Sequence, residues 1–316
     1  MLVTDIVTLP YMEFFETIEK RRLSIWGQAS FSGGTMNPVI YLAYDGSINA
    51  DWVARYALRI ACTVTDRRLR LVHIRDGAIS GEKLAAKLER IGAECRAMEV
   101  ELSISTVTLQ GDVLTTLLAN LPAGEDVYCL CGARATSREK GFLAGTVSQR
   151  LLRARQFNTL AVRVVNPGQL GCPANVMFPL AGHPRKFTAA MPFLSMFAPC
   201  MKKLILLRIM TVYPLFFRYL SAARARTLLR GGTGYVREVM RDIKQEMGEV
   251  GFRFDDHVLI SDDWVKEILI QAGKTRAGLM MLGASDRFLQ SRFFYGNKIE
   301  QILRHTPCDV GIYRKI

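Results

Sequence analysis

The stretch VYCLCG at residues 127–132 is an apolar run that stops at a glycine, and Gly145-Thr146 follows it. A matching run, LMMLG, ends at Gly283. A strand, a glycine loop and a helix start together form a phosphate cradle, because backbone N–H groups and the helix N-terminus then face the anion. The pattern therefore predicts strands with candidate anion sites at their carboxyl ends.

The two runs belong to a longer internal repeat with a constant spacing of 151 residues. The matching pairs are Leu109 and Ile260, Asp112 and Asp263, Gly132 and Gly283, Phe142 and Phe293, Gly145 and Gly296, Leu152 and Leu303, Arg153 and Arg304, and Arg163 and Arg314. Earlier in the chain, LRLVHI at 69–74 matches LILLRI at 204–209 at a spacing of 135. The second copy therefore carries about 16 extra residues, which we place in the segment 211–231.

Strand patterns alternate with helical patterns in both copies. Strands are predicted near 38–44, 69–74, 101–108, 126–131 and 158–165, and helices near 48–62, 80–97, 112–120 and 146–154. The second copy has predicted strands near 175–180, 203–209, 252–260, 278–282 and 309–314, and helices near 184–199, 233–249, 263–273 and 297–304. This order predicts an α/β fold of two tandem, doubly wound, parallel-sheet domains, each Rossmann-like and five-stranded.

The repeat also sets the expected domain boundaries. An N-terminal extension at 1–36 precedes a first domain at 37–167, a linker at 168–174 and a second domain at 175–316. The linker lies in a polar stretch that contains proline and glycine. Ligands of such folds bind where the carboxyl ends of strands meet helix starts, at a topological switch point.

The composition is that of a core-forming protein, with 49% hydrophobic and 22% charged residues. The net charge of +13 favours acidic partners such as nucleotides, nucleic acid or anionic lipid, and it is equally compatible with a solvated basic surface. Most of the seven cysteines lie in apolar runs, which predicts buried free thiols in a reducing compartment. Cys129 and Cys131 lack a second Cys/His pair, so core packing is favoured over a metal site.

Neither a signal peptide nor a membrane span is predicted. The N-terminal stretch has no basic region before its apolar residues, and lysines and arginines interrupt the most apolar stretch, 191–220. We therefore expect a cytoplasmic protein.

The glycine pattern of the first copy has the spacing Gly132-x2-Ala135-x9-Gly145-Thr146. This resembles the universal stress protein family, whose signature is Gly-x2-Gly-x9-Gly-Ser/Thr after the fourth strand. The spacing matches, and the sequence departs from the signature only at Ala135. Together with the duplication, this pattern makes the sequence resemble the tandem two-domain form of the family. The resemblance covers about residues 37–316.

The start of the first copy adds to the resemblance. The family's first strand ends in an Asp, often followed by Gly-Ser, and Asp45-Gly46-Ser47 fits this pattern. Ala43 stands where the family usually has a proline, which is a second departure. The resemblance implies that the two domains pack as a pseudo-dimer through their last strands, and that His73-Ile74 forms the edge framing an adenine.

A nucleotide in the first copy is also supported by the residues themselves. Gly132 would let phosphates approach the backbone, and Gly145 and Thr146 offer N–H donors and a hydroxyl at a helix start. Asp45 would accept a hydrogen bond from a ribose hydroxyl, and Arg134 would supply positive charge.

The candidate nucleotide-binding residues are Ala43, Asp45, Gly46, Ser47, Ile74, Gly132, Arg134, Ala135, Gly145 and Thr146. The expected ligand is ATP or a related adenine nucleotide, with Mg²⁺ as a counter-ion. The alternative is that these glycines serve only tight turns.

The second copy has lost parts of this pattern. Ala181 stands in the place of Asp45, Asp286 replaces the middle glycine, and Asn297 replaces Ser or Thr. A carboxylate beside phosphates disfavours binding unless a cation intervenes. We therefore expect a degenerate, nucleotide-free half that serves as the pairing partner of the first.

No catalytic site is predicted. The sequence has no GxxxxGK[ST] loop, no kinase signature and no GxSxG elbow. None of the four histidines has a nucleophile or ligand at a telling spacing, so structural roles are favoured. At most, slow ATP hydrolysis follows from the family analogy.

Two segments fall outside the repeat. The insertion 211–231 is basic and rich in aromatic residues, so it would lie on an anionic membrane, dock a partner protein, or pack as a lid on its own domain. The extension 1–36 would cover the body of the protein or reach a neighbouring subunit, and a homodimer is compatible with the sequence. Nucleic acid is disfavoured as a partner, because no recognised nucleic-acid module is present.

The leading functional hypothesis is a cytoplasmic, non-catalytic stress-response or regulatory protein that binds an adenine nucleotide in its first domain. The alternative is a nucleotide-independent interaction module, for example one linked to a membrane transporter and located at the inner face of the membrane.

Overall fold

The computed structural model describes residues 38–64, 66–133, 146–181, 184–284 and 295–316. The first half contains β1 (Val39–Ala43), α2 (Ile48–Ala61), β2 (Arg68–Arg75), α3 (Gly81–Ala97), β3 (Glu101–Thr108), α4 (Val113–Asn120), β4 (Gly124–Gly132), α5 (Val147–Ala154) and β5 (Phe157–Arg163). The second half contains β6 (Asn175–Leu180), α6 (Met191–Phe197), β7 (Lys203–Thr211), α7 (Pro214–Phe217), α8 (Ala222–Met247), β8 (Arg253–Ser261), α9 (Trp264–Lys274), β9 (Leu279–Gly283), α11 (Tyr295–His305) and β10 (Asp309–Arg314). Short 3₁₀ turns lie at Pro167–Gln169 and Pro184–Ala190.

The strands form one ten-stranded sheet in the order β3-β2-β1-β4-β5-β10-β9-β6-β7-β8. Within each half the paired strands are parallel, and the helices between them are the crossovers that such pairing requires. The α/β fold class predicted from the sequence, with two doubly wound five-stranded halves, is confirmed.

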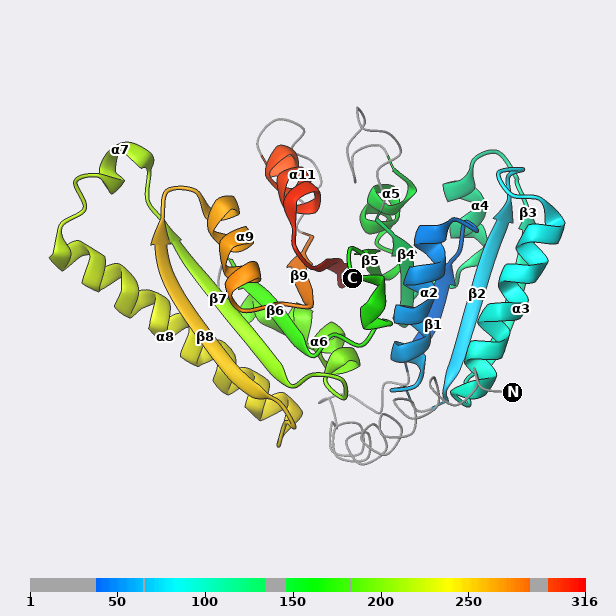
Figure 1. Cartoon of the computed structure of the whole chain (residues 1–316), viewed down its shortest axis with the longest axis horizontal. Coiled ribbons are helices and arrows are strands. Elements are labelled where there is room, and N and C mark those ends of the chain that lie inside the picture. The colour runs from blue at the N-terminus through cyan, green and yellow to red at the C-terminus, as the bar shows by residue number, and fades with distance from the viewer. Residues whose placement is uncertain (1–37, 65, 134–145, 182–183, 285–294) are drawn as a thin grey trace, which may run out of the picture.

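Helices cover both faces of this sheet (Figure 1). One core cluster packs α2, α3, α6 and α8 against the first face, and a second packs α4, α5, α9 and α11 against the other. Strands buried on both faces are apolar along most of their length, as in β7 and β9. This explains why continuous apolar runs, rather than alternating ones, mark these strands in the sequence.

The two halves join through β5 and β10, which pair antiparallel. Ala161 pairs with Ile312, which is its own counterpart at the repeat spacing of 151. A local pseudo-twofold axis therefore passes between these two residues. The sheet continues across the axis without a break.

The extra residues of the second copy form α7 and the beginning of α8. The connection from β2 to α3 spans residues 76–80, whereas the connection from β7 to α8 spans 212–221 and includes α7. The prediction that a helix starts near 233 is wrong, because α8 begins at Ala222. Gly231, Gly232 and Gly234 lower the helix propensity at this point, and the sequence pattern therefore favours a break that the helix does not have.

Candidate functional site

The turn after β1 leads directly into α2. The Asp45 carboxylate accepts a hydrogen bond from the Ser47 amide at 2.9 Å, and the Ser47 hydroxyl accepts one from the Ala50 amide at 3.1 Å, capping α2. Gly46 has a φ of +74°, a conformation that side chains with a Cβ rarely adopt. These contacts explain the order Asp-Gly-Ser and leave the Asp45 side chain exposed at the sheet edge.

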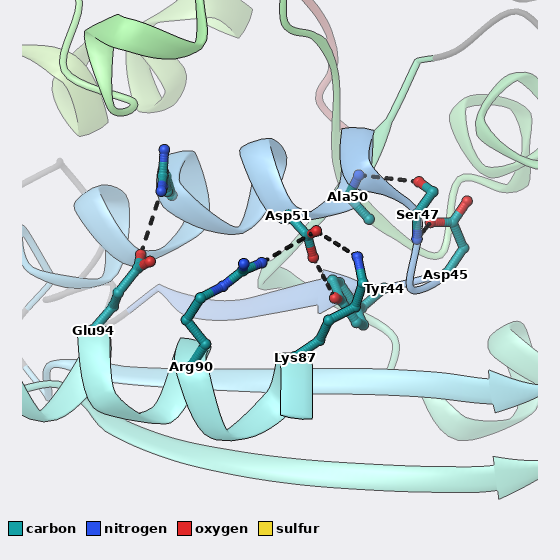
Figure 2. Close-up of polar contacts among 9 residues, drawn as sticks. Tyr44, Asp45, Ser47, Ala50, Asp51, Lys87, Arg90 and Glu94 are labelled. Atoms are coloured by element: carbon teal, nitrogen blue, oxygen red, sulfur yellow. Dashed lines mark hydrogen bonds and ion pairs between the residues drawn. The ribbon is translucent and has the colours of Figure 1, made fainter. Parts of the chain in front are cut away.

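Tyr44 anchors this turn to the body of the domain (Figure 2). Its hydroxyl donates to Asp51 of α2 at 2.5 Å, and Lys87 and Arg90 of α3 pair with the same carboxylate at 2.5 and 3.2 Å. Burial, followed by the hydrogen bond to Asp51, raises the pKa of Tyr44 well above its ordinary value. The tyrosine therefore stays neutral and keeps donating its proton at physiological pH.

The Tyr44 carbonyl has a second anchor in His73. The Nδ1 atom of His73 lies 2.8 Å from this oxygen, and because a carbonyl only accepts, Nδ1 carries the proton. The imidazole is 2% exposed. This contact gives His73 a structural role in holding the turn.

A pocket of about 210 Å³ opens beside this turn. It lies between the carboxyl ends of β1 and β4, where the chain crosses to opposite sides of β1, and this is the topological switch point of the first half. Its lining residues are Ala43, Tyr44, Asp45, Asn49, Ala50, Val72, Ile74, Asp76, Val113, Leu117, Cys131, Gly132, Thr146, Val147, Ser148 and Leu151. The site is largely apolar, with a few polar groups around it.

Five of the sequence-predicted residues line the pocket. They are Ala43, Asp45, Ile74, Gly132 and Thr146. Gly46 and Ser47 form the adjoining turn. Arg134, Ala135 and Gly145 lie outside the described residues, as do Asp286 of the second copy and the extension 1–36.

The amide of Asn49 occupies the space that a side chain at position 132 would fill. A Cβ on Gly132 would lie 2.6 Å from Asn49 Nδ2. Asn49 belongs to the first turn of α2, and its amide reaches the pocket only because position 132 is a glycine. The sequence pattern predicts that a phosphate approaches this glycine, and Asn49 is not among the predicted site residues.

Thr146 caps α5. Its hydroxyl accepts a hydrogen bond from the Gln149 amide at 3.2 Å and lies 2.9 Å from the Ser148 hydroxyl. Both hydroxyl-bearing residues are almost fully buried and line the pocket. The pocket therefore borders a helix N-terminus, where backbone N–H groups favour an anion.

Asp76 is a pocket residue that the sequence analysis missed. It directly follows β2, and Asp45 lies two residues beyond β1, so an acidic residue close to a strand end was the available signal. Among the described lining residues, the charged side chains are these two carboxylates. They suit sugar hydroxyls better than phosphates, because like charges repel.

No cluster of three or more His, Cys, Asp and Glu side chains able to hold a metal ion occurs among the described residues. All seven cysteines are free.

The equivalent edge of the second half has different chemistry. Arg208, the counterpart of His73, donates to the Leu180 carbonyl at 2.9 Å and lies over the Tyr235 ring at 4.3 Å. The Tyr235 hydroxyl donates to the carbonyl of Ala181 at 3.2 Å. The scaffold contact of the first half is thus kept, while the position of Asp45 has no carboxylate.

Neither a protein-family model nor a curated protein matches the sequence. A universal stress protein from Archaeoglobus fulgidus matches the fold with a TM-score of 0.54 at 13% identity, covering 89% of this chain and 97% of that one. A Pseudomonas aeruginosa protein, provisionally assigned as a universal stress protein, matches at 0.53 and 13%, covering 89% and 95%. The chain has the universal stress protein fold.

The universal stress protein fold is also matched by the cytoplasmic domain of a prokaryotic cation chloride cotransporter. Its TM-score is 0.55 at 9% identity, and the match covers 87% of this chain and 95% of that domain. Identities this low show the fold alone, and the function has to be argued from the site.

Proposed function

We propose that the first half of this protein binds an adenine nucleotide, ATP or a close relative, and that the protein acts as a regulator by presenting nucleotide-dependent surfaces. The observation that supports this most is the pocket at the switch point, where an apolar wall, an exposed carboxylate and a capped helix start converge. We further propose a cytoplasmic location, which the seven free thiols support.

The parts of the nucleotide are assigned by chemistry. Val72, Ile74 and Leu117 offer the apolar wall that a flat base needs. Asp45 accepts from the ribose hydroxyls, and the phosphates extend toward Thr146 at the start of α5. Magnesium would accompany the phosphates and offset their repulsion by the pocket carboxylates.

The test uses the full chain. Heat denaturation followed by chromatography of the supernatant identifies any co-purified nucleotide, and calorimetric titration of the apo protein with ATP, adenosine and GTP measures affinity and selectivity. Asp45→Ala should weaken ATP binding about tenfold or more, since it removes a hydrogen bond to a charged group. Asp126→Ala, at the opposite end of β4, is the matched control and should bind ATP as the wild type does.

The absence of both released nucleotide and a heat change with ATP would contradict the proposal. Equal ATP affinity in Asp45→Ala and the wild type would reject the assigned ribose contact. Phosphate release assays on the same samples separate binding from turnover, and steady turnover would contradict the non-catalytic role.

A second candidate is a nucleotide-independent interaction module. The exposed apolar residues of the 211–231 segment favour it, and the fold shared with a transporter's cytoplasmic domain is compatible with it. In that case the protein would bind its partner equally well with and without ATP.

A further inference from the structure

The 211–231 segment stands away from the rest of the molecule. Figure 1 shows α7 and the start of α8 projecting beyond β7 and β8 at one end of the sheet. The first buried residue of α8 is Gly232, and the preceding residues of this helix, 222–231, are exposed except for the partly buried Ala225 and Leu228. This arrangement is not the lid that the sequence left open as an alternative.

Large apolar side chains are concentrated at the tip of the segment. Tyr213 is 65% exposed, Leu215 68%, Phe216 69% and Tyr219 85%. Tyr213 and Phe216 touch each other, with ring centroids 6.3 Å apart, and Phe217 is also exposed. A contiguous exposed patch of this kind marks an interaction site, whereas isolated apolar residues on a surface do not.

The charges that follow the tip all have one sign. Arg218, Arg224, Arg226 and Arg230 are exposed, and the sequence has no acidic residue between Val212 and Arg237. On the neighbouring strand β8, the carboxylates are Asp255 and Asp256 near its start, and Asp262 and Asp263 follow its end. The projecting surface therefore complements a negatively charged partner.

We propose that the 211–231 segment docks the protein on an anionic phospholipid bilayer. The uncharged tip at 213–217 would enter the boundary between headgroups and acyl chains, where aromatic side chains are favoured. The arginines of the first turns of α8 would then lie at the level of the lipid phosphates. This order, an apolar tip backed by cations, favours a lipid surface over nucleic acid, which would be met by cations first.

The attachment would be peripheral. No described helix has the length and hydropathy needed to cross a bilayer. A few apolar side chains and four arginines give reversible binding that weakens with salt, because counter-ions screen the surface charge.

The test is flotation of the full chain with vesicles of phosphatidylcholine alone or with 30% phosphatidylserine, in the absence of nucleotide. Because no nucleotide is present, the outcome is independent of the function proposed above. The wild type should float only with the anionic vesicles at low salt. Arg224→Gln/Arg226→Gln should weaken this binding about 30-fold, since each arginine near an anionic surface contributes roughly a factor of five. Leu215→Ser/Phe216→Ser should weaken it at least about tenfold.

The matched control is Lys83→Gln/Arg96→Gln on α3, the counterpart of α8 in the first half, and it should bind like the wild type. All substituted side chains are exposed, and circular dichroism checks that each variant folds. Absence of flotation, equal flotation with neutral vesicles, or wild-type binding by both tip and arginine variants would overturn the proposal.

Sedimentation equilibrium and DNA retention are run in parallel. A dimer dissociated by Leu215→Ser/Phe216→Ser, or salt-dependent DNA binding without lipid binding, would assign the surface to a second copy or to nucleic acid instead.

Discussion

Two glycines beside the pocket are needed for different physical reasons. Gly46 adopts a φ of +74°, and a Cβ there would lie 3.0 Å from Ile79. The backbone of Gly132 is not in the left-handed region, and what it provides is space for the amide of Asn49. A glycine signature in a sequence therefore does not state which of these two properties is used.

Gly132→Ala should impair the pocket more than the fold. The atom that the new Cβ meets is the end of a flexible side chain, so Asn49 can rotate and the free energy of unfolding should fall by no more than about 1 kcal/mol. The displaced amide leaves the pocket, and we expect ATP affinity to fall as far as in Asn49→Ala. Calorimetric titration and urea unfolding measure the two effects.

The double variant Asn49→Ala/Gly132→Ala supplies the decisive comparison. If both changes act through the same amide, it binds ATP no more weakly than either single variant. Fully additive losses would show that Gly132 acts independently of Asn49. Gly168→Ala, where a Cβ would meet no atom within 4 Å, serves as the control.

The helix α8 has two parts with different energetics. Its residues beyond Gly231 pack against β7 and β8, with Val236, Val239 and Ile243 fully buried, whereas the first ten residues are exposed or at most partly buried. Ser221 caps the exposed end by accepting from the Arg224 amide at 3.3 Å. Local hydrogen bonds and continuity with the packed part hold the exposed turns, since short isolated helices are marginal in water.

Neighbouring glycines of α8 should respond oppositely to alanine. A Cβ on Gly232 would lie 2.4 Å from Val258 Cγ1, a stiff side chain on β8, so Gly232→Ala should destabilise the protein by about 1–3 kcal/mol. Gly231→Ala and Gly234→Ala meet no atom within 4 Å and should stabilise it by about 0.5–1 kcal/mol, because alanine is the better helix former.

Urea unfolding of the three variants at equal protein concentration checks these signs. The packing would be wrong at this point if Gly232→Ala were as stable as Gly231→Ala. A destabilised Gly231→Ala would show that the exposed turns of α8 contact another part of the protein.

At the scale of the whole molecule, the two halves also share a polar contact that is similar, but not identical, on the two sides of the pseudo-twofold axis. Asp309 is fully buried and accepts from the amides of Val165 and Asn166 at 2.7 Å and from the Tyr56 hydroxyl at 2.5 Å. Its counterpart at the repeat spacing is Asn158, which accepts from the Ile316 amide at 3.3 Å. One half thus uses a titratable group where the other uses a neutral one.

Asp309 should make the stability of the protein depend on pH. Burial raises its pKa, and the hydrogen bonds from Tyr56, Asn166 and Val165 oppose this without cancelling it. The folded state therefore binds a proton more tightly than the unfolded chain does. By linkage, the contribution of this group to stability falls as pH rises from its ordinary pKa, about 3.9, through the raised value in the folded protein.

Asp309→Asn removes this titration and copies the residue of the other half. The free energy of unfolding of the wild type minus that of the variant should fall with increasing pH across this window and then level off. Urea unfolding at several pH values between about 4 and 7 measures the difference. A difference that rises with pH would contradict the raised pKa.

The sequence alone determined the repeat, the alternation of strands and helices and the turn after the first strand. These are local properties: apolar runs predict buried strands, and Asp45-Gly46-Ser47 forms its turn and helix cap from neighbouring atoms. Five of the sixteen residues that line the pocket were predicted from such local signals, namely a strand end, a glycine or a helix cap.

Contacts between residues that are far apart in the sequence were decided only by the tertiary structure. Asn49 reaches the pocket because a strand 83 positions later ends in Gly132, and Asp76 joins it because β2 lies beside β1. The pairing of Ala161 with Ile312 makes one sheet of two halves, and the buried residues of α8 begin only at Gly232, ten residues into the helix. Burial and close approach are set by the whole chain, and no local pattern contains them.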